Sequence, residues 1–143
     1  MKVNNLMLGD LVEYNGYVCR VYSISLPFPR IEEKYSDKSI ITLWCDGFIS
    51  VTEDEIEPIH ITREILKKNG FEVTHESDYR TKWVNSDDDW LIEYSISKSD
   101  TARNFLRIYL EAPVIQMRVP YVHELQHALR LCGLSELADN FKV

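Results

Sequence analysis

The sequence contains few cysteines, few glycines and no long apolar run. Its three cysteines, Cys19, Cys45 and Cys132, are odd in number, lie far apart and form no C-x-x-C pair. Each has an apolar neighbour, so we expect three buried free thiols. Five glycines are too few to suggest a loop that cradles phosphates. The longest apolar stretches are only a few residues long, which excludes a membrane-spanning segment.

Basic residues are also in short supply. Sixteen Lys and Arg stand against 23 Asp and Glu, which gives a formal net charge of −7. Binding a nucleic-acid backbone needs clustered basic side chains that release counterions. Here they are spread over the separate segments 63–68, 80–82 and 103–107. We therefore expect no strong non-specific binding to nucleic acid, although the sequence leaves room for a small local basic patch.

The remaining composition is that of a soluble globular protein. Hydrophobic residues make up 45% of the 143 positions and charged residues 27%. This length fits one ordinary domain or two very small ones. Residues 1–7 contain no apolar run followed by a cleavage site of small residues. We therefore expect a cytoplasmic location and no membrane association.

The first sixty residues alternate between short extended runs and tight turns. Asn15-Gly16 predicts a hairpin, because both residues tolerate a positive φ. Pro27-Phe28-Pro29 ends the second run, since proline cannot donate to a strand ladder, and a polar loop follows at 30–39. The expected strands are 10–14, 17–26, 40–45, 48–51 and 56–61. Five strands of this length predict a small SH3-like β-barrel over residues 1–61.

Residues 62–143 show a different pattern. Thr62 suits the N-cap of a helix over 63–69, and Gly70 suits the position after its end. Alternating apolar residues then predict an antiparallel meander. Its expected strands are 79–84, 90–96, 105–110 and 115–119. Pro120 opens a second helix over 121–132, and Gly133 ends it. A turn at 135–139 and an edge strand at 141–143 complete the chain.

The predicted fold class is therefore α+β. A small SH3-like β-barrel at 1–61 is followed at 62–143 by an antiparallel sheet covered by two helices. The boundary is soft, and the two parts are also compatible with one compact unit.

One motif in the second helix suggests chemistry. His123-Glu124-Leu125-Gln126-His127 matches H-E-x-x-H, in which two histidines one helical turn apart bind zinc. His123 and His127 would be the metal ligands. Glu124 would take a proton from a metal-bound water. This alternative interpretation is a minimal zinc hydrolase.

Other features of the sequence favour a non-catalytic interpretation. His123 and His127 share one side of the helix with Gln126 and Arg130, opposite an apolar stripe, which predicts that both imidazoles face solvent. A catalytic zinc needs three protein ligands, and the extended motif would require a histidine where this chain has Gly133. Only sixteen residues follow the motif. We therefore expect no cofactor, with zinc only as the alternative.

Three stretches carry a resemblance to known proteins. They are 121–133 (YVHELQHALRLCG), 8–12 (LGDLV) and 62–71. Together they resemble a group of small uncharacterised proteins from Bacteroides and related gut bacteria, many of them in phage-derived or other mobile regions. In that group Gln often stands at the position of Glu124, and Asn at that of His127. The resemblance implies a bacterial cytoplasmic protein with a barrel-like start and a helix near its end, and it lends no activity.

Aromatic residues of the first part suggest a binding surface. Tyr14, Tyr17, Trp44 and Phe48 would form a groove of the kind by which small barrels grip peptides, or would fill the barrel core.

Three further groups have simpler structural interpretations. Asp87-Asp88-Asp89 lacks the spacing of a calcium loop and predicts a solvated turn. Trp83 and Trp90 flank the same turn and would pair across strands. The acidic run 53–57 predicts a wet turn or a surface that docks on a basic partner.

The sequence thus favours a non-catalytic binding protein of a bacterial mobile element or prophage, whose partner is another protein. Its oligomeric state stays open. A minimal zinc hydrolase is the first alternative, and a small barrel associated with nucleic acid is the second.

Overall fold

The structure, a computed structural model, describes residues 1–25, 38–87, 89–110 and 113–143. The chain divides into two compact units, Met1–Ile59 (unit 1) and His60–Val143 (unit 2). Two antiparallel sheets and short helices give an α+β protein, as predicted. The predicted stop at Pro27-Phe28-Pro29 and most of the predicted loop 30–39 lie outside the described residues.

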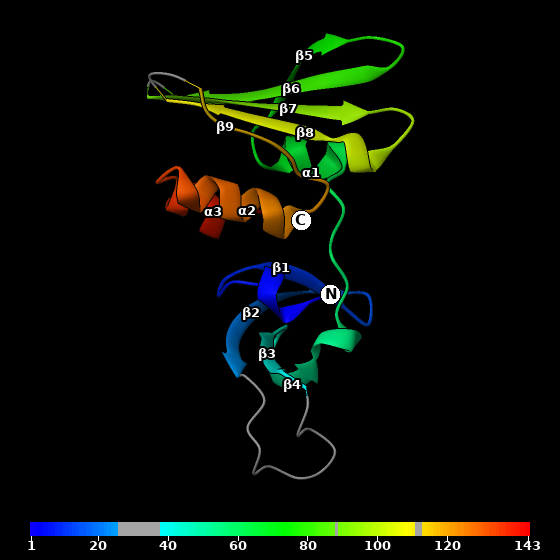
Figure 1. Cartoon of the computed structure of the whole chain (residues 1–143), viewed down its shortest axis with the longest axis vertical. Coiled ribbons are helices and arrows are strands. Elements are labelled where there is room, and N and C mark those ends of the chain that lie inside the picture. The colour runs from blue at the N-terminus through cyan, green and yellow to red at the C-terminus, as the bar shows by residue number, and fades with distance from the viewer. Residues whose placement is uncertain (26–37, 88, 111–112) are drawn as a thin grey trace. The chain divides into compact units, whose positions relative to one another are not determined.

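Unit 1 is built around a four-stranded antiparallel sheet with the order β1-β2-β3-β4 (Figure 1). Its elements are η1 (Val3–Asn5), β1 (Leu11–Tyr14), β2 (Tyr17–Ser25), β3 (Ile40–Trp44), β4 (Phe48–Thr52) and the 3-10 helix η2 (Glu53–Glu55). The predicted hairpin is confirmed, because Asn15 and Gly16 have φ values of 50° and 81° and join β1 to β2. The core buries Leu6, Val12, Cys19, Val21, Ile41, Leu43, Val51 and Ile56.

The predicted fifth strand at 56–61 does not form. The chain meets β1 there through one isolated bridge, in which Glu13 and Glu57 exchange two backbone hydrogen bonds of 2.9 Å. Pro58 follows at once, and proline has no N–H to continue a ladder. The described residues of unit 1 therefore form a sheet with one bridged edge and no closed barrel.

Unit 2 begins with a helix and continues as a five-stranded antiparallel meander, β5-β6-β7-β8-β9. Its elements are α1 (Arg63–Lys68), β5 (Glu72–Glu76), β6 (Arg80–Asp87), β7 (Trp90–Ser97), η3 (Thr101–Arg103), β8 (Phe105–Tyr109), β9 (Pro113–Arg118), α2 (Val122–Leu131) and α3 (Ser135–Asp139). The predicted N-cap is confirmed, because the Thr62 hydroxyl accepts a hydrogen bond of 3.3 Å from the backbone N–H of Ile65.

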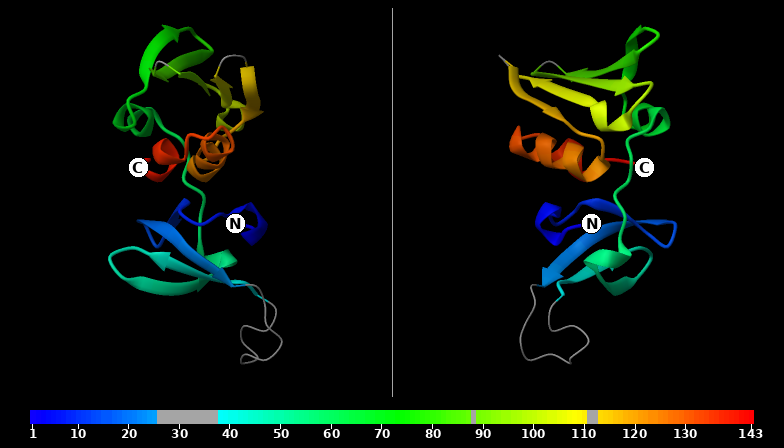
Figure 2. Two further views of the ribbon diagram at one scale, coloured as in Figure 1. Left: turned by 90° about the vertical axis from the view of Figure 1, so that its left-hand side faces the viewer. Right: turned by 45° about the vertical axis from the view of Figure 1, so that its right-hand side comes forward.

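One face of the second sheet is covered and the other is open. The strands alternate, so Trp83, Tyr94 and Leu106 point to the same face, and each is at most 1% exposed. Helices α1 and α2 lie on one side of this sheet (Figures 1 and 2). The side chains that alternate with the buried ones on β6, β7 and β8 therefore stand on the uncovered face.

Several local predictions in unit 2 were wrong. Strand β5 was not predicted, because it is an edge strand beside β6 whose residues are all exposed, so no alternation of buried and exposed side chains marks it. Strand β6 continues to Asp87, which pairs with Trp90, so the turn is shorter than predicted and Trp83 pairs with Tyr94 rather than with Trp90. Asp88 lies outside the described residues. Residues 135–139 form a short helix, and 141–143 form no strand.

Among the described residues, no helix has the length and apolar content that crossing a membrane would require.

Candidate functional site

Aromatic side chains gather on unit 1. Tyr22, Trp44 and Phe48 stand on the outer face of the sheet, whereas Tyr14 and Tyr17 pair on the face that also carries Val12 and Cys19. Phe48 contacts Trp44 and Tyr22, with ring centroids 4.8 and 4.7 Å apart and both pairs in edge-on geometry. Strand pairing brings these rings together, because Trp44 lies opposite Phe48 in the β3–β4 ladder. Phe48 and Tyr22 are each 61% exposed, and Trp44 is 48% exposed. We call Tyr14, Tyr17, Tyr22, Trp44 and Phe48 the aromatic surface.

Two hollows border the aromatic surface. One, of about 470 Å³, is lined by Tyr14, Tyr17 and Phe48 together with Asp46. The other, of about 290 Å³, is lined by Tyr17 and Trp44. The structure thus brings together all four residues for which the sequence predicted a groove. Only Tyr14 also packs against the core. Whether the four bind a ligand stays a prediction.

Tyr22 belongs to this surface and was missed from the sequence. A register shift between Val21 and Ser23 interrupts the β2–β3 ladder. Such a bulge re-aims a side chain relative to strict alternation. Alternation with Cys19 and Val21, each 1% exposed, nevertheless places Tyr22 on the exposed face, so this pattern could have revealed it.

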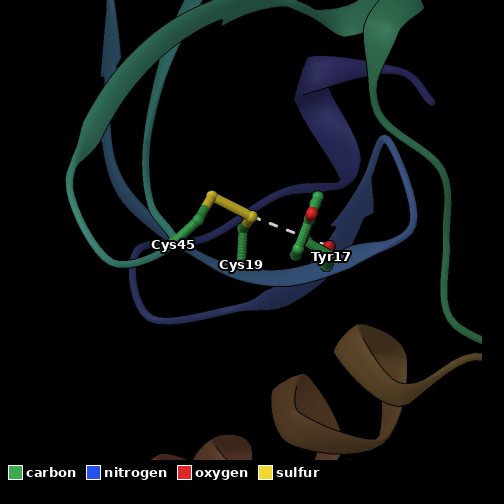
Figure 3. Close-up of a disulfide and its surroundings, with 3 residues drawn as sticks. All are labelled: Tyr17, Cys19 and Cys45. Atoms are coloured by element: carbon green, nitrogen blue, oxygen red, sulfur yellow. Dashed lines mark hydrogen bonds between the residues drawn. A yellow bond between two sulfur atoms is a disulfide. The ribbon is translucent and has the colours of Figure 1, made fainter.

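A disulfide joins Cys19 to Cys45 beside the same hollows (Figure 3). Their Cα atoms are 4.6 Å apart, since the pairing of Arg20 with Trp44 places the two cysteines opposite each other. The Sγ atom of Cys19 lies 3.6 Å from the backbone oxygen of Tyr17. The prediction of free thiols is therefore wrong for Cys19 and Cys45. Cys132 is a free thiol, as predicted, but it is half-buried rather than buried; partial burial raises its pKa above the ordinary value.

The prediction that both imidazoles of the H-E-x-x-H motif face solvent is wrong. His123 is only 2% exposed, while His127 is half-buried. Helix α3 packs on the side of α2 that carries Gln126 and Arg130. Gln126 Nε2 donates a 2.8 Å hydrogen bond to the backbone oxygen of Ala138, and Arg130 pairs with Asp139 at 3.0 Å. The polar side of α2 is thus covered by the helix that follows it.

The two imidazoles form part of a row of ring contacts within unit 2. An isolated bridge joins His60 to Tyr121, and their rings are 4.8 Å apart. The Tyr121 ring stacks on His123 at 5.7 Å and 12°, and His123 meets His127 edge-on at 5.8 Å. His60 therefore contacts this group of rings through Tyr121, although it lies far upstream in the sequence. These ring contacts cover part of the buried His123 side chain.

Glu124 occupies the third position of α2 and reaches back to the helix start. Burial raises the pKa of its carboxyl, while a hydrogen bond from the backbone N–H of Tyr121 and the charge of His127 act in the opposite direction. A glutamate at this position commonly accepts a bond from the N-cap residue. Its Oε2 atom is buried and accepts no hydrogen bond from a described residue. The third position of α2 is one from which a glutamate can cap the start of the helix.

The part of the chain that the structure describes contains no group of three His, Cys, Asp or Glu side chains arranged to hold a metal ion. The zinc site at His123 and His127, with Glu124 as base, therefore stays an untested prediction.

The sequence matches no protein-family model, and neither the curated proteins nor the solved structures give a match. The predicted likeness to proteins of Bacteroides mobile regions therefore stays a prediction, and the function must be argued from the surfaces themselves.

Proposed function

We propose that this protein is a non-catalytic binding protein of a bacterial mobile element or prophage. Its unit 1 acts as an SH3-like barrel that grips an extended segment of a partner protein. The bridge between Glu13 and Glu57 supports the barrel. After η2 it pairs the chain that follows β4 with β1, the opposite edge of the sheet, as the closing of a barrel requires. The observation that carries the proposal is the aromatic surface.

Large exposed aromatic rings at one place favour binding. Tyr17, Trp44 and Phe48 are 67%, 48% and 61% exposed, and they border hollows rather than a flat sheet. Contiguous exposed apolar area on a soluble protein marks an interaction site. Aromatic-lined grooves bind extended proline-rich segments, which lose little conformational entropy because they are already extended when free.

Charge defines the partner segment further. Unit 1 contains ten acidic and five basic residues, a formal charge of −5, and Asp46 lines the larger hollow. An extended segment with apolar side chains and a nearby Lys or Arg complements this surface. The occupant of the aromatic surface is therefore a basic, proline-rich peptide segment.

The test uses the full chain and two synthetic decapeptides. One contains prolines, two leucines and two arginines, and the other has glutamates in place of the arginines. We expect the arginine peptide to shift the NMR signal of the Trp44 indole N–H and to bind at least tenfold more tightly than its acidic twin. Phe48→Ala should weaken this binding at least tenfold.

Tyr79→Ala is the matched control, because Tyr79 is an 83% exposed aromatic residue of unit 2. It should leave the peptide affinity unchanged. No shift of the Trp44 signal at millimolar peptide, or equal losses in both variants, would contradict the proposal.

Location is a separate expectation. We propose the cytoplasm, as the sequence suggested, but the disulfide between Cys19 and Cys45 weighs against it, because disulfides persist in oxidising compartments and are rare in the cytosol. Cells lysed in an alkylating reagent decide the matter. Alkylation of Cys19 and Cys45 would support a cytoplasmic protein, and an unmodified pair beside an alkylated Cys132 would refute it.

A further inference from the structure

Four arginines from four separate segments gather on the open face of the sheet in unit 2. Arg80 comes from β6, Arg103 from η3, Arg107 from β8 and Arg118 from β9. Together with Phe105 they line a hollow of about 490 Å³. We call these five residues the arginine hollow. The sequence spreads the arginines over 39 positions, so only the fold brings them together.

Strand alternation explains why the arginines share a face. On β8, Phe105 and Arg107 alternate with Leu106 and Ile108, which are fully buried on the helix side. The ladder places Arg118 directly opposite Phe105. The arginine hollow therefore stands on the uncovered face, with its guanidinium groups open to a ligand.

Carboxylates neutralise only part of this charge. Arg103 lies 3.4 Å from Asp100, and Arg107 lies 3.8 Å from Glu93, which is already paired with Lys82.

The guanidinium groups of Arg80 and Arg118 form no ion pair with any described residue. Four like charges around one hollow repel each other, and an anion placed among them removes that repulsion. The arginine hollow is thus electrostatically complementary to a ligand that carries more than one negative charge.

The ring of Phe105 favours some of these anionic ligands over others, because it can stack on an aromatic base. Phe105 lies among the arginines, and the Cζ atom of Arg107 is 5.3 Å from its ring centroid. Arginine forks bind phosphate oxygens in pairs, and an aromatic ring next to a basic groove stacks an unpaired base.

We propose that the arginine hollow binds single-stranded nucleic acid, with the arginines on its phosphates and Phe105 under one base. A duplex does not meet this requirement, because its bases are stacked and unavailable. The net charge of −7 on the whole chain opposes long-range attraction. Binding is therefore modest and salt-sensitive, in keeping with the expectation that this chain is no strong non-specific binder.

The number of arginines sets the salt dependence. Each phosphate contact to a single strand contributes a slope of about −0.7 to the plot of log affinity against log salt concentration. Four contacts give about −2.8, so the affinity should fall about 50-fold between 50 and 200 mM salt.

The experiment titrates the full chain into a fluorescein-labelled octathymidylate and follows anisotropy at several NaCl concentrations. Arg80→Gln combined with Arg118→Gln should reduce the affinity at 50 mM NaCl at least tenfold and halve the salt slope. Lys67→Gln combined with Lys68→Gln is the control, because it removes the same charge from exposed positions of α1. It should change the affinity less than twofold.

A second variant separates nucleic acid from other anions. Phe105→Leu keeps apolar bulk but removes the aromatic face, so it should weaken octathymidylate binding about fivefold or more and leave tripolyphosphate binding unchanged. No binding of octathymidylate at 20 mM NaCl overturns the proposal, as does an equal loss in the lysine control. Equally tight binding of tripolyphosphate or of an oligoglutamate peptide, with no effect of Phe105→Leu, makes this a simple anion site and also overturns it.

Discussion

Breaking the disulfide between Cys19 and Cys45 should destabilise unit 1. The bridge closes a chain segment with a sequence separation of 26 residues and links β2 to the end of β3. On the chain-entropy model, closing a loop of that length stabilises the folded state by about 3.5 kcal/mol at 25 °C. A small domain is only marginally stable, so this is a large share of what holds unit 1 together.

Hydrogen exchange followed by mass spectrometry measures the effect in unit 1 alone, which matters because the two units need not unfold together. Peptides from β2 and β3 should lose protection by up to about 300-fold in the double variant Cys19→Ser and Cys45→Ser, since every 1.4 kcal/mol is a factor of ten. Wild-type protein in reductant should match the double variant. Peptides from β6 and β7 should keep their protection.

Cys132→Ser is the control, because Cys132 is a free cysteine at the end of α2. It should leave the exchange of β2 and β3 unchanged. The reasoning fails if reductant does not alter exchange in these strands, or if Cys132→Ser alters it as much as the double variant does.

Three smaller changes test local features of unit 2. Thr62→Ala should lower the free energy of unfolding by about 1 kcal/mol through loss of the N-cap of α1, whereas Thr74→Ala at an exposed position of β5 should have little effect in the same denaturant titration. Gln126→Ala should cost about 1 kcal/mol, measured in the same way, because it removes the buried hydrogen bond from Nε2 to the carbonyl of Ala138, which keeps only a longer bond of 3.4 Å from the N–H of Phe141. The pKa of the Glu124 carboxyl is raised in the folded state, so the free energy of unfolding should fall as pH rises from about 4.5 through that folded pKa. Glu124→Gln should flatten this decline in denaturant titrations at a series of pH values. An unchanged pH profile in the variant would contradict the prediction.

Local signals in the sequence predicted the parts of the fold that local chemistry decides. Asn15-Gly16 turns because both residues tolerate positive φ, and Thr62 starts α1 through its own hydroxyl. The alternation of β6 to β8 follows from one buried and one open face. These features depend on neighbours in the chain, so the sequence reveals them.

Features that depend on distant pairing could not be predicted in this way. Cys19 and Cys45 are 26 residues apart in the chain, and they can form a disulfide only because the register of the β2–β3 ladder places them opposite each other. His123 is buried in a unit whose last helix, α3, covers the polar side of α2, and a helical wheel of α2 alone cannot contain that information. The arginine hollow likewise exists only once the strands have paired.

The net charge of the whole chain hides how the charge is distributed. Unit 1 has a formal charge of −5 and unit 2 of −2, yet unit 2 carries the arginine hollow. Added salt screens both the attraction of a basic peptide to unit 1 and the attraction of phosphates to the arginine hollow, so it weakens both kinds of binding and cannot tell them apart. Local substitutions can, because the binding charges lie in different units. Asp46→Asn should weaken the peptide only, and Arg118→Gln the oligonucleotide only, whereas a surface that bound both ligands would respond to each substitution in both assays.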